Sequence, residues 1–294
     1  MSRDRLGLGP NPSIHAVIVN WNGWKHTQHC VESLTNLGHP GLREIIVVDN
    51  GSSDGSVEKL RRFAAGHSLR VRIVANKKNL GYARGSNRGM RVATKNGADL
   101  VLLLNNDMAF EQPDFLDRMV RAFRVHPRLG LAGPLLLENG GYQGPFEERP
   151  RYTSLISKLV ARLYFREFPP TAPKGKQRTQ EKPASRFAYG VRGCCMMFRA
   201  KALTEVDYFD EATFLYYEEY LMAERLRARR WKTRFVADAE AFHVGEASTR
   251  RVDEEAILAM KIESAMHYYG GVRGFTAQQL RQIVMLMRLG RDAA

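Results

Sequence analysis

The sequence predicts an α/β fold with a mainly parallel sheet that is covered by helices on both faces. Two observations support this prediction. Short runs of aliphatic and β-branched residues, such as EIIVVDN (44–50) and ADLVLLLNND (98–107), are apolar on both faces of a strand. Segments with apolar residues at helical spacing separate these runs, and such an alternation of strands and helices is typical of parallel sheets.

The alternation of strands and helices runs from residue 14 to residue 107. The predicted strands are IHAVIVNW (14–21), EIIVVDN (44–50), VRIVAN (71–76) and ADLVLLLNND (98–107). A first helix is predicted from the apolar spacing over 30–37, and a second, SSDGSVEKLRRFA (52–64), begins with residues that cap helices. The third, GYARGSNRGMRVATKNG (81–97), carries a glycine at every fourth position from Gly81 to Gly89, which predicts close packing on the sheet.

The composition indicates a globular chain with a strong positive charge. Its 294 residues are 44% hydrophobic, which is enough for a full core. Lys and Arg number 45 and Asp and Glu number 31, so the net charge is +14. This charge favours polyanionic partners such as nucleic acid, anionic lipid or phosphorylated small molecules, but does not choose among them.

Cysteine usage and the lack of apolar targeting segments favour a cytoplasmic location. Cys30, Cys194 and Cys195 show neither a CxxC motif nor metal-ligand spacing, so we expect reduced, buried thiols. The N-terminal MSRDRLGLGPNPS lacks the apolar core of a signal peptide, and no window approaches about 18 apolar residues. The chain is therefore expected in the cytoplasm, either free or peripheral on the inner face of the cell membrane.

Polar side chains end the predicted strands. They are Asn20, Asp49, Asn76 to Asn79, and Asn105 to Asp107. Any one of them is explained by a turn or a helix cap. In series they favour a ligand site, because the carboxyl ends of parallel strands converge on one crevice. An EF-hand does not fit the spacing from Asp49, and neither a GxGxxG motif after the first strand nor a Walker-type loop is present.

Four motifs in order resemble the nucleotide-sugar half of family 2 inverting glycosyltransferases, which have the GT-A fold. The motifs are VIVNWNG (17–23), EIIVVDNGSSDGS (44–56), NLGYARGSNRGM (79–90) and LLLNND (102–107). The segment from Gly190 to Trp231 is similar to the acceptor side of that family, and AFHVGEAST (241–249) is similar to its His-containing loop. Among family members the sequence is most similar to rhamnosyltransferases that extend bacterial surface glycans.

The resemblance implies a domain organisation. A GT-A domain is expected over 13–249, with a nucleotide-sugar half at 13–110 and an acceptor half at 111–249. The acceptor half would contain a basic insertion at 141–186, and a helical extension would follow at 250–294.

The resemblance also implies a donor site for a nucleotide-diphosphate sugar. The expected donor-binding residues are Asn20, Asp49, Asn79, Gly81, Arg84, Asn87, Asn105 and Asn106. Asp49 would accept the imide N–H of a uridine or deoxythymidine base, which cytosine lacks, and Arg84 would approach the phosphates. The leading single donor is dTDP-rhamnose, on the family resemblance alone.

A divalent metal, Mn²⁺ or Mg²⁺, is expected to neutralise the leaving diphosphate. The family's DxD motif is replaced here by Asn105-Asn106-Asp107, so Asp107 is the expected metal anchor. His243 is the second expected ligand, since imidazole suits manganese. Capping or packing of the following loop is the alternative role for His243.

Glu218 and Glu219 are the candidates for the general base that takes the proton of the acceptor hydroxyl. The alternative is that both are first-turn acids favoured by the helix dipole. By resemblance Glu219 is preferred, because it lies where the family usually has Asp. The sequence departs from the family's acidic EDxD pattern in that Glu219 is longer and Leu221 replaces the last acid.

The acceptor is expected to be a glycan or a polyprenyl-diphosphate-linked glycan. The segments 154–168 and 275–291 are amphipathic and basic, and they either pack on the domain, dock on an anionic membrane or form a homo-oligomer. Two other functions, a sugar nucleotidyltransferase and a basic nucleic-acid-binding protein without turnover, are the alternatives. A sugar nucleotidyltransferase would need a Gly/Arg/Lys-rich activation loop near the N-terminus, which is absent, and the spread of basic residues without a binding module argues against nucleic acid.

Overall fold

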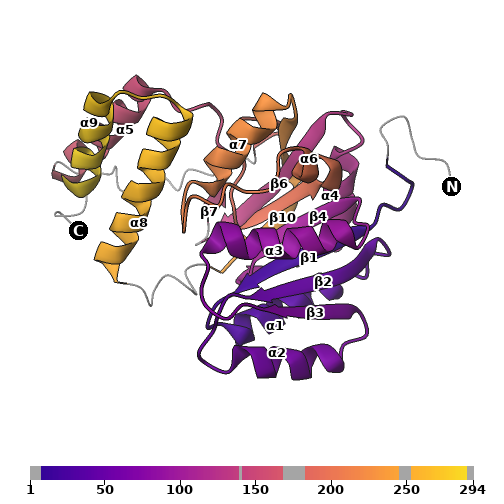
Figure 1. Ribbon diagram of the computed structural model, residues 1–294. Helices are drawn as coiled ribbons and strands as arrows, with labels where there is room; N and C mark the ends of the chain where they lie inside the picture. The colour runs from indigo at the N-terminus through magenta and orange to yellow at the C-terminus, as the bar shows by residue number, and fades with distance from the viewer. Residues whose placement is uncertain (1–7, 139–140, 168–182, 245–252, 290–294) are drawn as a thin grey trace, which may run out of the picture.

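The computed structural model describes residues 8–138, 141–167, 183–244 and 253–289 (Figure 1). Residues 168–182 of the predicted insertion and residues 245–249 of the predicted His-containing loop lie outside the described residues. The predicted α/β architecture is confirmed, because a ten-stranded sheet carries helices on both faces. The division of the chain into two halves and a C-terminal extension remains a prediction.

The sheet has the strand order β3-β2-β1-β4-β9-β6-β10-β5, with β7 paired to β6 and β8 to β10. The strands are β1 (Ile14–Asn20), β2 (Leu42–Asp49), β3 (Arg70–Ala75), β4 (Leu100–Asn105), β5 (Met108–Ala109), β6 (Leu129–Glu138), β7 (Gly141–Gln143), β8 (Arg186–Ala188), β9 (Cys195–Arg199) and β10 (Lys232–His243). Strands β1 to β4 pair in parallel. Strand β9 lies antiparallel between β4 and β6, and therefore joins the two predicted halves in one sheet.

Helices cover the sheet in two layers that follow the predicted alternation. They are α1 (Trp24–Thr35), α2 (Ser56–Ala65), α3 (Tyr82–Lys95), α4 (Phe115–Ala122), α5 (Tyr152–Glu167), α6 (Ala200–Glu205), α7 (Glu218–Ala228), α8 (Glu254–Met266) and α9 (Ala277–Leu289). Buried residues of α1, α2 and α4 share one core with the sheet, and those of α3, α6 and α7 share the core on the opposite face. All three cysteines are free and buried, as expected.

Helix α3 lies very close to the sheet. A Cβ at Gly89 would lie 2.4 Å from a Val17 methyl carbon of β1 and 2.8 Å from a Val48 methyl carbon of β2. Only glycine fits at this distance, so the predicted packing role of the glycine stripe is confirmed at Gly89.

Helices α5, α8 and α9 gather at one side of the molecule, beyond α7 (Figure 1). A cluster rich in aromatic residues, which includes Tyr268 and Tyr269, packs them against the start of α7. A π-helical turn, His267–Val272, connects α8 to the segment before α9. None of the helices in the described part of the chain has both the length and the apolar composition that crossing a bilayer requires.

Candidate active site

A cavity of about 530 Å³ opens at the carboxyl ends of β1 and β4. Its lining residues are Val19, Trp21, Asn50, Asn79, Gly81, Tyr82, Asn105, Asn106, Asp107, Gly193, Cys194, Phe214, Leu215, Tyr216, Glu218, Glu219, His243 and Met260. The structure therefore brings to one cavity the predicted residues Asn79, Gly81 and Asn105 to Asp107, together with both acids of α7 and His243.

Asn20 and Asp49 lie behind the cavity wall in a buried polar network. The Asn20 amide donates to Asp49 Oδ2 at 2.7 Å, and its carbonyl oxygen accepts from the Thr27 hydroxyl at 2.7 Å. Ser52 donates to Asp49 through its backbone N–H at 3.0 Å and its hydroxyl at 2.7 Å. Because Asp49 is fully buried, the residues around its carboxylate would have to rearrange before a pyrimidine ring could reach it.

Asn50 organises the loop that carries the predicted donor residues. Its amide nitrogen donates to Asn79 Oδ1 at 2.9 Å and to the carbonyl of Gly81 at 3.0 Å. Its amide oxygen accepts from the side chain of Asn76 at 2.9 Å and from the backbone of Leu80 at 3.2 Å. Asn50 was predicted only as the last residue of a strand, whereas in the structure it both lines the cavity and anchors this loop.

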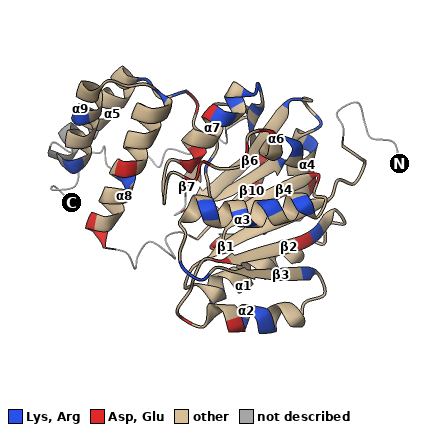
Figure 2. Cartoon of the chain, in the orientation of Figure 1, with Lys and Arg blue, Asp and Glu red and all other residues tan. Residues whose placement is uncertain are grey.

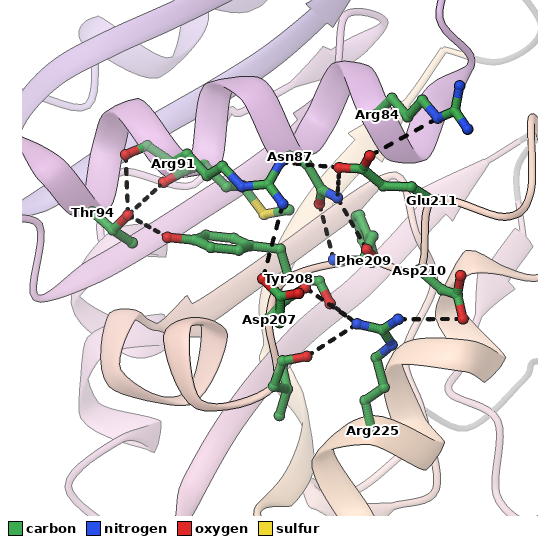
Figure 3. Close-up of polar contacts among 12 residues, drawn as sticks. Arg84, Asn87, Arg91, Thr94, Asp207, Tyr208, Phe209, Asp210, Glu211 and Arg225 are labelled. Carbon is green, nitrogen blue, oxygen red and sulfur yellow. Dashed lines mark hydrogen bonds and ion pairs between the residues drawn. The ribbon is translucent and has the colours of Figure 1, made fainter.

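The structure does not bring Asn87 and Arg84 to the cavity. Asn87 is buried, and its amide nitrogen donates to the carbonyl of Phe209 and to Glu211, while its oxygen accepts from the Phe209 N–H (Figure 3). Arg84 is half exposed and lies 3.9 Å from Glu211. Both residues face the loop at 207–211 and not the donor side, because they lie on the flank of α3 that packs against this loop. Their predicted contacts with the nucleotide remain predictions.

Asp107 and His243 meet at the wall of the cavity. His243 Nε2 lies 3.4 Å from Asp107 Oδ1, and His243 Nδ1 lies 3.0 Å from Glu138 Oε1. Burial alone lowers the pKa of His243, but Asp107 and Glu138 outweigh it, so the pKa lies above the ordinary value. Glu138 was not predicted, since it is far from His243 in the sequence and becomes its neighbour only through the pairing of β6 with β10.

Glu218 and Glu219 begin α7 after a strained turn. Tyr216 and Tyr217 both have left-handed backbones, with φ of 74° and 69°, which is costly for bulky residues. The turn presents both acids to the cavity. Glu219 Oε1 accepts the backbone N–H of Gly193 at 3.1 Å, whereas Glu218 Oε1 is buried and has no hydrogen-bond partner among the described residues.

Burial raises the pKa of both carboxyl groups. Burial and then the neighbouring Glu219 raise the pKa of Glu218 to about 8. Burial also raises the pKa of Glu219, but the Gly193 N–H and the charge of Arg192 oppose that rise. Two neighbouring buried carboxyl groups are costly to ionise together, and Glu219 is the member with a described N–H donor and a nearby arginine to favour its charged form.

Several residues that line the cavity were not predicted from the sequence to be part of the site. Trp21 was predicted only as the last residue of the strand 14–21. Met260 comes from α8, in the predicted C-terminal extension, and Ser264 of the same helix donates to the carbonyl of Leu215 at 2.8 Å. The C-terminal helices therefore support the loop that carries the acid pair.

The sequence profile described as "Glycosyl transferase family 2" matches residues 15–206. The chain belongs to this family. The glycosyltransferase is 26% identical over 245 residues to an N-acetylglucosaminyl-diphospho-decaprenol L-rhamnosyltransferase of Mycobacterium tuberculosis, covering 80% of this chain and 77% of the relative. It is 25% identical to the low-salt glycan biosynthesis hexosyltransferase Agl10 of Haloferax volcanii, covering 72% of this chain and 60% of the relative.

Solved structures share the fold of this glycosyltransferase. The structure of GalNAc-T7 with UDP, GalNAc and Mn²⁺ superposes with a TM-score of 0.63 at 14% identity, over 97% of this chain but only 55% of that chain. The mannosyltransferase PcManGT of Pyrobaculum calidifontis, in complex with GDP-Man and Mn²⁺, gives 0.57 at 16% identity, over 97% of this chain and 76% of that one. The expected GT-A fold is confirmed.

We predict that Gly193→Ala impairs transfer without unfolding the glycosyltransferase. A Cβ at Gly193 would lie 2.6 Å from Glu219 Oε1, so the carboxylate must move away from its present partner. The turnover rate should fall about 10²-fold, as expected when a general base is misplaced.

Gly190→Ala is the matched control, since its Cβ meets nothing nearer than 3.4 Å and its transfer rate should stay close to that of the unmodified enzyme. Equal rates for the two variants and the parent enzyme would contradict the assigned position of Glu219.

Proposed function

We propose that this glycosyltransferase moves a sugar, with inversion, from a pyrimidine nucleotide diphosphate to a hydroxyl of a polyprenyl-diphosphate-linked glycan. The observation that carries the proposal is the meeting, in one cavity, of the Asn79–Gly81 loop, the Asp107–His243 pair and the Glu218–Glu219 pair. The first suits a nucleotide, the second a cation and the third a proton transfer. Family membership supplies the reaction class.

The leading donor is dTDP-rhamnose, followed by UDP-linked sugars. Support for rhamnose comes from the L-rhamnosyltransferase relative, at 26% identity. Trp21, Asn50 and Asn79 all line the cavity, and they offer a flat aromatic face and amide groups for a base and ribose. The predicted imide contact of Asp49 would then require a rearrangement of the residues around its carboxylate.

Asp107 and His243 fit a divalent metal. They place a carboxylate oxygen and an imidazole nitrogen 3.4 Å apart on the cavity wall, and Glu138 occupies the other ring nitrogen, which leaves Nε2 for a ligand. Among the described residues no set of three or more His, Cys, Asp or Glu side chains is arranged to hold a metal, so the donor's diphosphate would complete the coordination. When bound there, Mn²⁺ or Mg²⁺ supplies positive charge to the leaving diphosphate.

Glu219 is the proposed base. The Gly193 N–H holds one of its oxygens and Arg192 favours its charged form, so the other oxygen can take the acceptor proton. The proton passes to Glu219 as the acceptor oxygen bonds to the anomeric carbon and the bond to the nucleotide diphosphate breaks.

The proposed acceptor follows the named substrate of the mycobacterial relative, an N-acetylglucosaminyl-diphospho-decaprenol. Loop residues 214–216 and Met260 give this side of the cavity an apolar and aromatic wall, which suits the face of a sugar ring. A lipid-linked acceptor would place the enzyme at the cytoplasmic face of the cell membrane in polysaccharide synthesis.

Replacing Glu219 with Gln should lower transfer by about 10²-fold or more, because Gln keeps the size of the side chain but cannot accept the proton. Glu218→Gln should cost less. Asp107→Ala should weaken donor binding as well as turnover. Initial rates with a panel of dTDP-, UDP-, GDP- and CDP-linked sugars, together with calorimetric donor affinities, measure these effects.

Glu263→Gln, an exposed change on α8, is the control and should leave the rates unchanged. Near-normal transfer by Glu219→Gln with loss in Glu218→Gln would identify Glu218 as the base. Normal transfer in both would contradict the proposed chemistry, and a preference for GDP- or CDP-sugars would contradict the proposed donor.

Chelation should abolish transfer, and Mn²⁺ or Mg²⁺ should restore it, because the described residues that line the cavity include no Lys or Arg to neutralise the diphosphate. Calorimetry should show Mn²⁺ binding that strengthens when UDP or dTDP is present. Asp107→Ala and His243→Ala should weaken that binding, whereas His26→Ala, an exposed histidine on α1, should not. Full activity after exhaustive chelation would rule out a metal role for both residues.

A further inference from the structure

Helix α9 is apolar on two faces, but the described part of the protein covers only one of them. Its inner face packs Ile283, Leu280 and Met287 into the aromatic cluster with α5 and the π-helical turn. On its outer face Met285 is 54% exposed and Leu289 is 47% exposed. A second apolar face that the described protein leaves exposed indicates a contact with another surface.

The outer face of α9 borders an open apolar groove. The groove is lined by Met266 of α8 and by Ala277, Leu280, Arg281, Val284, Met285, Arg288 and Leu289 of α9. These α9 residues recur three and four positions apart, and the face they form runs for about 18 Å. The groove is therefore a continuous feature of one helix face and not a scatter of exposed side chains.

The charge of this face is of one sign. Arg281 and Arg288 are exposed at the groove two turns apart, and α9 contains no acid in AQQLRQIVMLMRL (Figure 2). Helix α8 contributes only Met266 to the lining. Of the acids of α8, Glu254 and Glu255 lie at the opposite end of the helix, and Glu263, one turn before Met266, is exposed but does not line the groove. An apolar stripe with arginines and no acids complements a surface with hydrocarbon beneath anionic headgroups.

The groove lies close to the catalytic cavity along α8. Met260 lines the cavity and Met266 lines the groove. The two residues are about 9 Å apart along the axis of α8, as the rise per residue of an α-helix gives. A surface held by α9 would thus be a short distance from the acceptor side of the acid pair.

We propose that the outer face of α9 docks on an anionic lipid bilayer, with Met285 and Leu289 in the interface and Arg281 and Arg288 at the lipid phosphates. Docking in this way holds the cavity beside the membrane in which a lipid-linked acceptor resides. This delivery role rests on the proposed function, whereas the lipid contact itself does not.

The test is sedimentation of the full chain with vesicles, without donor or acceptor. Binding to phosphatidylglycerol–phosphatidylcholine vesicles should exceed binding to pure phosphatidylcholine and should weaken with salt. The double variant Arg281→Gln/Arg288→Gln should lose about tenfold or more in affinity, and Met285→Glu/Leu289→Glu should abolish binding. Transfer to a short, water-soluble acceptor should be unchanged in both, while transfer to a vesicle-embedded acceptor should fall.

Matched controls lie elsewhere on the surface. Val125→Glu changes an apolar residue that is 55% exposed, and Arg121→Gln/Arg227→Gln removes two exposed charges, so both should bind vesicles like the unmodified chain. Equal binding to neutral vesicles, no binding to either, or losses in the controls as large as in the α9 variants would overturn the proposal. A dimer in ultracentrifugation that Met285→Glu/Leu289→Glu dissociates would assign the face to a second copy instead. Failure of transfer with intact vesicle binding would contradict only the proposed function.

Discussion

The cavity depends on the close approach of two backbones, at Gly81 and at Phe214. The Tyr82 N–H donates to the Phe214 carbonyl at 2.7 Å, and a Cβ at Gly81 would lie 2.4 Å from that same oxygen. Gly81 also has φ of +84°, which favours glycine. This contact joins the start of α3, on the donor side, to the loop that ends in the acid pair. Donor loop and carboxylates therefore face one space, which a single-step transfer between two substrates requires.

Burying Glu218 and Glu219 side by side costs free energy, and several parts of the fold fix the position of this acid pair. Two adjacent buried carboxyl groups cannot both ionise cheaply, and burial raises the pKa of each. The left-handed turn before them costs about 1–3 kcal/mol per residue and persists only where its surroundings fix it. Ser264 of α8 bonds to this loop at Leu215, and the aromatic cluster packs around Tyr217. This explains why helices beyond the family-matched residues 15–206 contribute to the site.

Local sequence signals predicted the sheet and the ends of its strands, because burial on both faces and strand polarity follow from neighbouring residues. The positions of Asn79 and of Asn105 to Asp107 at the cavity follow from that rule. The rule does not extend to Arg84 and Asn87, because a helix has several faces and only tertiary packing places these two side chains against the loop at 207–211. The places of Glu138 and Met260 at the site could not be predicted from neighbouring residues, because both lie on segments that are distant in sequence from the other site residues.

The proposed carboxylate base, acting opposite a departing diphosphate, implies a single displacement at the anomeric carbon. The anomeric configuration of the product, determined by NMR of the purified glycan against that of the intact donor, tests this mechanism. Glu219 acting as a base on the acceptor hydroxyl predicts a product linkage of inverted configuration. A retained configuration would contradict that role, because it requires either a covalent sugar–enzyme intermediate or attack from the side of the leaving group.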